Sequence, residues 1–562
     1  MIQNNYKKIK TAYVNRVKWK TFSIQLLLFL ALKSSISLAQ PHSIILGRPT
    51  NNSITASILF EQNVEYFLTF GTQSNNHTNQ TPNFTNLSGT PDEVDMQGLL
   101  SNTKYYYKVK YKPVGGQSYS ETPEYSFHTQ RLPGSEFSFT LEADEHLYDK
   151  KGVKSIYQIC LDNQKKDNPD FMMSLGDIFG DDHNPFTITS DSLDILHKNY
   201  RPFLGSLCHS IPFYVCLGNH EGENDYYLLQ NPPNNLAINA TLWRKFYYPN
   251  PYPNSFYSGN TEMEPFGVDY PENYYSWTWG DALFVVLDVY RNECDTSPKP
   301  KNWNWSLGYP QYTWLRNTLE NSTAKFKFVF AHHVRGQGRG GATNAKLFEW
   351  GGYEQNGNNY TFDTNRPGWG KPIHQLFKDN GVNIFFQGHD HVFAHEVLDS
   401  VTYQALPMAA DSTYEIGMLA NAGAYLTDTL DGTGHIKVTV NSACVKVDYV
   451  RAYLPADTLS GLHQNGEIAF SYTIGDCSTQ STNEIMQMEK IFIYPNPSKD
   501  LINIQYFNNS NSKKVKLING IGQTFIQNNT NQIDVSQYSN GLYFLVVETE
   551  NSVITNKVIV NH

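Results

Sequence analysis

The stretch Phe213-Tyr214-Val215-Cys216-Leu217-Gly218-Asn219-His220 joins a short apolar run to a turn that ends in an amide and an imidazole. Four other apolar runs in the central part of the chain also lead into residues that can bind metals. These runs and their clusters are 137–141 with Asp144-Glu145-His146, 171–175 with Gly176-Asp177, 326–330 with Ala331-His332-His333, and 382–386 with Gly388-His389-Asp390-His391. The runs alternate with helical stretches, which predicts an α/β domain.

The position of the five clusters predicts one shared site. In open α/β sheets, ligands bind in the crevice beyond the carboxyl ends of the strands. Taken singly, an Asp-x-His is usually a surface pair and a Gly-Asp is usually a turn, so five separate loops are the alternative. Five clusters in order, each after an apolar run, favour convergence. Asp and His supply oxygen and nitrogen ligands that suit Zn, Fe or Mn.

The overall composition is that of an acidic, folded chain. It has 562 residues, with 53 acidic and 43 basic side chains and a formal charge of -10. Hydrophobic residues make up 40% of the chain, which supplies large buried cores. The acidic balance and the lack of a long basic run argue against a nucleic-acid binding domain, but not against an enzyme that acts on nucleotides.

The N-terminal segment, residues 1–39, is interpreted as a targeting signal. A basic head without acidic residues precedes an apolar run at 22–32, and Ser37-Leu38-Ala39 follows. This order is typical of a secretory signal peptide. The apolar run is too short to cross a bilayer of about 30 Å as a helix. An uncleaved membrane anchor is the alternative. No later stretch is long enough for a stable transmembrane segment, so export is expected.

Export would permit disulfides, and the chain has six cysteines that the sequence alone does not pair. Cys160 and Cys216 lie among apolar residues and are expected to be buried thiols. The better candidates for bridges are Cys208, Cys294, Cys444 and Cys477.

Residues 40–131 have the pattern of short strands. Residues 53–60 alternate between polar and apolar side chains, which predicts a half-buried strand. Residues 104–111 are rich in Tyr and Val, which fit a pleated surface. A small β-sandwich is the natural package for such strands.

The ordered motifs Asp-x-His, Gly-Asp, Gly-Asn-His, His and Gly-His-x-His resemble those of the calcineurin-like metallophosphoesterase family. The resemblance covers roughly residues 137–450 and implies a central α/β metallophosphatase β-sandwich flanked by helices, assigned to residues 135–475. Residues 40–131 look like the fibronectin type III-like domain that precedes the catalytic domain in purple acid phosphatases. The segments that carry this second likeness are 46–50, 98–109 and 125–129.

The family resemblance implies two metal ions (Fe, Zn or Mn), which supply a nucleophilic hydroxide and positive charge around phosphoryl oxygens. The implied reaction is hydrolysis of phosphate monoesters by attack of a metal-bound hydroxide, as in an acid phosphatase-like enzyme. The ligands implied for the first ion are Asp144, His146, Asp177 and His391. Those implied for the second ion are the bridging Asp177 with Asn219, His332 and His389.

The residues beyond the metal ligands are expected to handle the substrate. His220 follows Asn219 and could protonate the leaving-group oxygen, which makes it catalytic together with Asp177. A packed loop histidine is the alternative. Arg335 and Arg339 could bind phosphate bidentately or be solvated surface charges. The expected substrate-binding residues are Asn219, His220, His333 and Arg335. The acids after His220 that are expected to support the loop are Glu221, Glu223 and Asp225.

One position departs from the purple acid phosphatases. Those enzymes carry an iron-ligating tyrosine three residues after the bridging Asp, where this chain has Gly180. This argues against a ferric-tyrosinate centre and favours Zn, Mn or Fe(II) mixtures. The family's Pro and Tyr after the third-block His are also replaced, by residues 334–339. Acid-phosphatase specificity therefore does not transfer directly.

The C-terminal part, residues 488–562, follows a polar linker at 476–487 and resembles the sorting domain of the type IX secretion system of Bacteroidota. A carbohydrate-binding or adhesive sandwich is the alternative, which no stripe of aromatic residues supports. The resemblance implies the type IX secretion machinery as a partner and delivery to the cell surface or the medium. The matching segments are 493–497, 520–523, 541–547 and 557–560.

Three functional hypotheses follow from these features. The leading one is an exported dinuclear metal-dependent phosphatase that acts on phosphate monoesters. A phosphodiesterase or nucleotide pyrophosphatase could use the same site. A cell-surface binding protein with a degenerate catalytic domain is the alternative from another class, and the complete ligand set argues against it.

Overall fold

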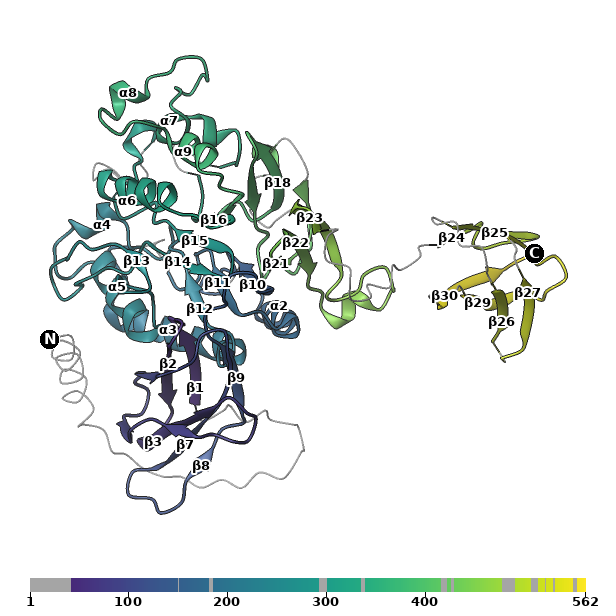
Figure 1. Ribbon diagram of the computed structural model, residues 1–562, viewed down its shortest axis with the longest axis horizontal. Coiled ribbons are helices and arrows are strands. Elements are labelled where there is room, and N and C mark those ends of the chain that lie inside the picture. The colour runs from purple at the N-terminus through teal and green to yellow at the C-terminus, as the bar shows by residue number, and fades with distance from the viewer. Residues whose placement is uncertain are drawn as a thin grey trace. The chain divides into compact units, whose positions relative to one another are not determined.

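A computed structural model gives the arrangement of the chain (Figure 1). It divides into two compact units, Met1–Cys477 and Ser478–His562. The predicted signal peptide and most of the predicted linker lie outside the described residues. The described residues are 42–149, 151–180, 185–292, 301–334, 339–415, 422–425, 429–477, 491–506, 514–520, 522–528, 531–548 and 553–562.

The first unit begins with two antiparallel sheets that enclose a core of apolar and aromatic side chains. This arrangement is the predicted β-sandwich, and its fibronectin type III-like character stays a prediction. One sheet has the order β1 (His42–Gly47), β2 (Ser53–Phe60), β6 (Asp92–Gln97). The other consists of β4 (Asn79–Gln80), β3 (Val64–Gly71), β7 (Lys104–Pro113) and β8 (Ser120–Glu121), with β5 (Phe84–Asn86) on β3 and β9 (Tyr125–His128) on β7.

The rest of the first unit is built on two further sheets. The first has six strands: β12 (Phe213–Val215), β11 (Phe171–Ser174), β10 (Phe137–Glu142), β21 (Gly434–Val440), β22 (Cys444–Arg451) and β23 (Ile468–Gly475). The second has eight: β13 (Ser258–Gly259), β14 (Tyr275–Trp279), β15 (Ala282–Val286), β16 (Phe326–Phe330), β17 (Ile384–Gln387), β19 (Val401–Ala405), β18 (Phe393–Leu398) and β20 (Thr429–Leu430).

Phenylalanine side chains join the inner faces of these two sheets. Phe139 on β10 lies against Phe284 on β15 and Phe328 on β16, with ring centroids 5.1 and 5.6 Å apart. The outer faces are covered by helices that include α2 and α3 on one sheet and α6, α7 and α9 on the other. Strands covered on both faces read as continuous apolar runs, which is why five such runs stand out in the sequence. The expected two-sheet sandwich flanked by helices is therefore observed.

The helices of the first unit have the following bounds: α2 Lys154–Asp167, α3 Ser190–Cys208, α4 Asp225–Leu228, α5 Leu236–Tyr247, α6 Tyr309–Glu320, α7 Phe348–Gly351, α8 Phe362–Asn365 and α9 Ile373–Asp379. Among the described residues, no helix has both the length and the apolar character needed to cross a membrane.

Strand direction brings the ligand clusters to one edge. The strands β10, β11 and β12 run parallel, and so do β15, β16 and β17. The carboxyl ends within each set of parallel strands therefore lie at the same edge, where the loops with the ligand residues begin.

The strand at 53–60 is observed, but the prediction that it is half-buried is wrong. Thr55, Ser57 and Leu59, on the face expected to be open, are all buried. Leu59 joins the core under α2 and α3, and Ser57 Oγ donates to the carbonyl of Tyr247, at 2.8 Å. The outer face of this sheet is thus an interface with α3 and the end of α5, which an alternating pattern does not reveal.

Arg201 on α3 fastens this interface. Its guanidinium donates to the side-chain and carbonyl oxygens of Ser43 and of Ser57, and to the carbonyl of Tyr247, at distances of 2.6–3.3 Å. The side chain is almost fully buried, so these acceptors have little access to water. The N-terminal sandwich is therefore held as part of the first compact unit.

The cysteines behave partly as predicted. Cys444 and Cys477 form a disulfide, and Cys160 and Cys216 are free and buried. Cys208 is also free and buried, so its expected place among the bridging cysteines is wrong. It lies at the end of α3 with its Sγ 3.5 Å from Met172 Sδ, inside an apolar core. Cys294 lies outside the described residues.

The second unit is a small β-sandwich with its own core. One sheet has the order β24 (Ile491–Tyr494), β25 (Leu501–Tyr506), β28 (Gln532–Asp534). The other has the order β27 (Thr524–Asn528), β26 (Lys514–Asn519), β29 (Gly541–Glu548), β30 (Val553–Val560).

Replacement of Arg201 by Met should lower the free energy of unfolding of the first unit by about 3 kcal/mol, because several buried acceptors lose their donor. Lys198→Ala on the same helix is the control, since its pair with Asp194 is partly exposed and should be worth less than about 1 kcal/mol. Denaturant unfolding measures both. Equal losses in the two variants would contradict the role given to Arg201.

Acid should destabilise the same region through His197. Burial lowers the pKa of His197 to about 3, and Arg244 and Arg201 add to the shift. The unfolded chain then binds a proton at a higher pH than the folded chain does. The associated stability is therefore present above pH 6.5 and is lost at up to about 1.4 kcal/mol per pH unit below it. In unfolding measured from pH 7 to pH 4, His197→Phe should show a shallower loss than the wild type.

Candidate metal centre

The five loops meet at a single cluster of buried side chains. Among the described residues, those that could hold a metal ion form three overlapping groups. His146 belongs to the first and second groups, and Asp177 belongs to the second and third. The groups are Asp144 with His146 and His391, His146 with Asp177 and His220, and Asp177 with His332 and His389. The convergence predicted from the strand ends is observed.

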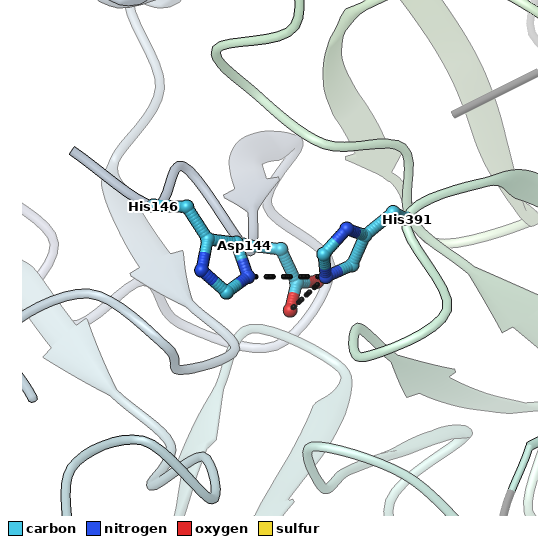
Figure 2. Close-up of side chains that lie close together, drawn as sticks. All are labelled: Asp144, His146 and His391. Atoms are coloured by element: carbon cyan, nitrogen blue, oxygen red, sulfur yellow. Dashed lines mark hydrogen bonds and ion pairs between the residues drawn. The ribbon is translucent and has the colours of Figure 1, made fainter. Parts of the chain in front are cut away.

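The first group joins the loop after β10 to the loop after β17. Figure 2 shows both imidazoles and the carboxylate turned toward one another. His146 Nε2 and His391 Nε2 are 3.1 Å apart, and His391 Nε2 is 3.6 Å from Asp144 Oδ1. An oxygen and two imidazole nitrogens facing a common point are the donors that Zn, Fe and Mn accept.

The third group joins the loops after β11, β16 and β17. His332 Nε2 lies 3.2 Å from Asp177 Oδ2 and 3.1 Å from His389 Nδ1. The same nitrogen is 3.8 Å from Asp144 Oδ1, which connects the two groups. Asp177 belongs to two of the three groups, as expected for a bridging carboxylate.

The outer nitrogen of His332 is fixed by the backbone. Its Nδ1 is 2.7 Å from the carbonyl of Leu175, so Nδ1 carries a proton and Nε2 faces the cluster. Burial alone would lower the pKa of His332, but Asp177 and Asp144 raise it to about 9. A cation that bound at this point would displace that second proton.

Asp144 provides the test of whether the residues fit a metal. Its side chain is fully buried, and among the described residues no hydrogen bond reaches Oδ1. Burial raises the pKa of Asp144 to about 6, a shift that His332 opposes and Asp177 increases. A buried carboxylate oxygen without a hydrogen bond is costly unless a positive charge faces it. The donor set therefore fits one or more metal ions.

Five of the residues that could hold a metal ion also have unusual backbone conformations. Asp144, Asp177 and His389 have φ values of 57°, 60° and 68°, and His146 and His391 are left-handed as well. Each such non-glycine residue costs on the order of 1–3 kcal/mol unless its surroundings enforce it. Five of them in one cluster point to a functional requirement.

One carboxylate holds the strained Asp177 loop and the neighbouring loop after β12. Glu221 accepts hydrogen bonds from the backbone N–H groups of Asp177, Ile178 and Phe179, at 3.0, 2.7 and 3.2 Å. It also accepts one from Gly218, at 2.6 Å. Glu221, expected to support the loop, therefore fixes both the Asp177 loop and the loop that carries Asn219 and His220.

Glycines allow these loops to lie in contact. A Cβ on Gly218 would lie 2.2 Å from Asp177 Oδ1, and one on Gly388 would lie 2.7 Å from Asp144 Oδ2. A Cβ on Gly180 would lie 1.5 Å from the carbonyl oxygen of His220. Position 180 therefore has no room for any side chain, let alone a tyrosine. The absence of the purple acid phosphatase tyrosine at this position therefore follows from the close contact between Gly180 and the His220 loop.

The predicted substrate residues lie around the cluster. His220 Nε2 is 3.9 Å from Asp177 Oδ2, and its backbone N–H donates to Asp177 Oδ1, at 2.8 Å. Asn219 Oδ1 is 3.5 Å from the hydroxyl of Tyr290, whose ring lies 6.0 Å from that of His332. His220 is therefore one of the residues that could hold a metal ion, and Asn219 lies close to Tyr290 beside His332.

The remaining predictions concern three residues of the loop after β16. His333 is buried, and its ring stacks on that of His389 with centroids 4.2 Å apart, so it supports a ligand, and its contact with substrate stays a prediction. Arg339 donates to the carbonyl of His389 and pairs with Asp390, at 3.6 Å. Arg335 lies outside the described residues, so its phosphate-binding role also stays a prediction.

Two tyrosines at the site were not anticipated. Tyr148 contacts His146, and Tyr290 contacts Asn219. Tyr148 comes two residues after His146, so its spacing could have indicated it. Tyr290 follows β15, a run without ligand residues, so no motif marks it.

The observed fold agrees with comparisons to known proteins. Residues 139–393 match the calcineurin-like phosphoesterase family, and residues 492–561 match the secretion system C-terminal sorting domain. The chain therefore contains a calcineurin-like phosphoesterase domain and a C-terminal sorting domain. No curated protein matches the chain.

Two solved structures share the fold. PhoD is 17% identical, with 77% of this chain and 90% of that chain covered and a TM-score of 0.54. Purple acid phosphatase PPD1 from yellow lupin seeds is 14% identical, with 77% and 74% covered and a TM-score of 0.51. At such identities, the likeness shows the fold alone.

Replacement of Glu221 by Gln should weaken the whole site. The amide offers one acceptor oxygen and turns N–H donors toward backbone N–H groups, so the first unit should lose about 2 kcal/mol of stability and retain fewer metal ions. Metal content by mass spectrometry and thermal unfolding measure these effects. Glu320→Gln on the exposed side of α6 is the control. Unchanged metal content and stability would show that Glu221 does not hold the loops.

Proposed function

We propose that this protein is an exported metal-dependent phosphatase that hydrolyses phosphate monoesters. The proposal rests on one observation: two Asp side chains and five His side chains from five loops converge on one largely buried cluster in a calcineurin-like phosphoesterase domain. Bound ions at such a cluster activate water and stabilise negative charge on the phosphoryl oxygens. The ligands we assign are Asp144, His146, Asp177, Asn219, His332, His389 and His391.

Side chains of the protein would donate the proton, orient the loops and keep the negative charge of the site low. His220 is partly exposed and lies next to Asp177, so it can give a proton to the leaving-group oxygen. Asp177 orients the His220 loop through the backbone N–H of His220. The neutral amide of Asn219 adds no negative charge where an anionic substrate must enter. The left-handed loops hold these groups in place before substrate binds.

Phosphate diesters and nucleotides are the alternative substrate classes. The same cluster could serve a phosphodiesterase or a nucleotide pyrophosphatase, because the chemistry at the phosphorus atom is shared. Position 180 does not carry the purple acid phosphatase tyrosine, and residues 334–339 differ from that family. The metals we favour are accordingly Zn, Mn or Fe(II).

The location follows from the C-terminal unit. A sorting domain indicates export and a cell-surface or secreted enzyme. We assign the type IX machinery as its partner and residues 1–39 as the signal peptide. An exported phosphatase would release phosphate from esters outside the cell.

Hydrolysis of nitrophenyl phosphate and of its bis-ester tests the function. The mature chain is loaded with Zn, Mn or Fe, and Asp177→Asn is compared with the exposed control Asp379→Asn. Monoester turnover should fall by at least about 100-fold in Asp177→Asn, because loss of a ligand exceeds the effect of losing a supporting contact. Asp379→Asn should match the wild type.

The other outcomes discriminate between the alternatives. Preference for the bis-ester would move the protein to the phosphodiesterases and leave the site unchanged. No metal-dependent turnover on either ester, together with no bound metal, would support the binding-protein alternative.

A further inference from the structure

The outer nitrogen of His146 has two partners that no part of the proposed reaction uses. The Nε2 of His146 faces His391, as Figure 2 shows, so its Nδ1 faces away from the cluster. The hydroxyl oxygen of Tyr148 lies 2.8 Å from this Nδ1, and Asp149 Oδ2 lies 3.5 Å from it. An imidazole that binds a cation through one nitrogen carries its proton on the other. Tyr148 and Asp149 are placed to accept a hydrogen bond from that N–H group.

The ring of Tyr148 faces a second imidazole. Its centroid is 5.8 Å from that of His220 and 5.4 Å from that of His146. The rings of His146 and His220 are themselves 5.3 Å apart and nearly perpendicular. One tyrosine therefore contacts a predicted metal ligand with its hydroxyl and the predicted proton donor with its ring.

His220 needs such a contact because its backbone alone does not orient its ring. Its N–H is held by Asp177, and its carbonyl packs against Gly180. These contacts fix where the side chain begins. The imidazole beyond them is partly exposed, and its Nε2 lies 3.9 Å from Asp177 Oδ2. The neighbouring rings of Tyr148 and His146 further restrict its rotation.

We propose that Tyr148 is a positioning residue with two separable roles, an inference that rests on the proposed function. Its hydroxyl, beside Asp149, accepts a hydrogen bond from Nδ1 of His146 and so holds the ring with Nε2 toward the site of the first metal ion. Its ring holds His220 toward the leaving group. Groups that orient a metal-binding histidine typically change metal affinity by 10–100-fold when they are removed.

Two substitutions separate the roles. Tyr148→Phe removes the hydroxyl and keeps the ring, and Tyr148→Leu removes both but keeps an apolar side chain. Tyr105→Phe is the matched control, because its hydroxyl accepts a hydrogen bond from the backbone N–H of Leu100 in the N-terminal sandwich. Thermal unfolding establishes that each variant is folded.

The first measurement is metal affinity by competition with a chelator. Tyr148→Phe and Tyr148→Leu should both bind one of the ions about tenfold more weakly than the wild type, and Tyr105→Phe should not. Wild-type affinity in Tyr148→Phe would overturn the role of the hydroxyl. A wild-type protein that binds no metal would overturn the proposed function and this inference with it. Failure of the inference alone is recognised by a wild-type protein that binds metal and a Tyr148→Phe variant that binds it equally well.

The second measurement is the dependence of turnover on the leaving group at saturating metal. Aryl phosphates with increasingly basic phenols should give the same slope for Tyr148→Phe and the wild type. The slope for Tyr148→Leu should be steeper, because a misplaced His220 helps poor leaving groups less. Equal slopes in all variants would overturn the role of the ring.

Discussion

The site depends on four hydrogen bonds from backbone N–H groups to the carboxylate of Glu221. They join the turn after β11 to the turn after β12, so Asp177 and the Asn219-His220 pair are fixed relative to each other. The bonds compensate for left-handed backbone at Asp177 and for the close approach of the two turns at Gly218 and Gly180. The buried carboxylate of Glu221 thus holds the two loops together, a role that would otherwise fall to metal ligation alone. The relative position of the two turns is therefore fixed by hydrogen bonds within the chain.

Much of the site could be predicted from the sequence because the ligands follow apolar strands. The motifs at Asp144, Asp177 and His389 mark strand ends, and parallel strands bring their ends together. The five runs were visible because both faces of their sheets are covered. The sequence also shows that Gly180 stands where the purple acid phosphatases have a tyrosine. The contact between Gly180 and the His220 loop, which explains this glycine, is visible only in the structure.

Other features arise only when distant segments pack. The open face expected for residues 53–60 is covered by α3 and by the end of α5, and no local pattern encodes that partner. Cys208 was a candidate for a bridge by elimination, whereas its apolar surroundings come from α2, β11 and β12. Tyr290 reaches Asn219 from a loop that no motif identifies. Sequence periodicity reports which residues are apolar, but not which surface will cover them.

The disulfide has a mechanical consequence for a chain that carries a sorting domain. Cys477 ends the first compact unit, and its partner Cys444 begins β22, which lies between β21 and the edge strand β23. Tension applied to the chain beyond Cys477 therefore enters the sheet through a covalent bond to an inner strand. The hydrogen bonds between β22 and β23 are shielded from that load and cannot be opened one after another from the C-terminal end. A pull on the sorting domain would be resisted by the catalytic unit as a whole rather than by its weakest edge.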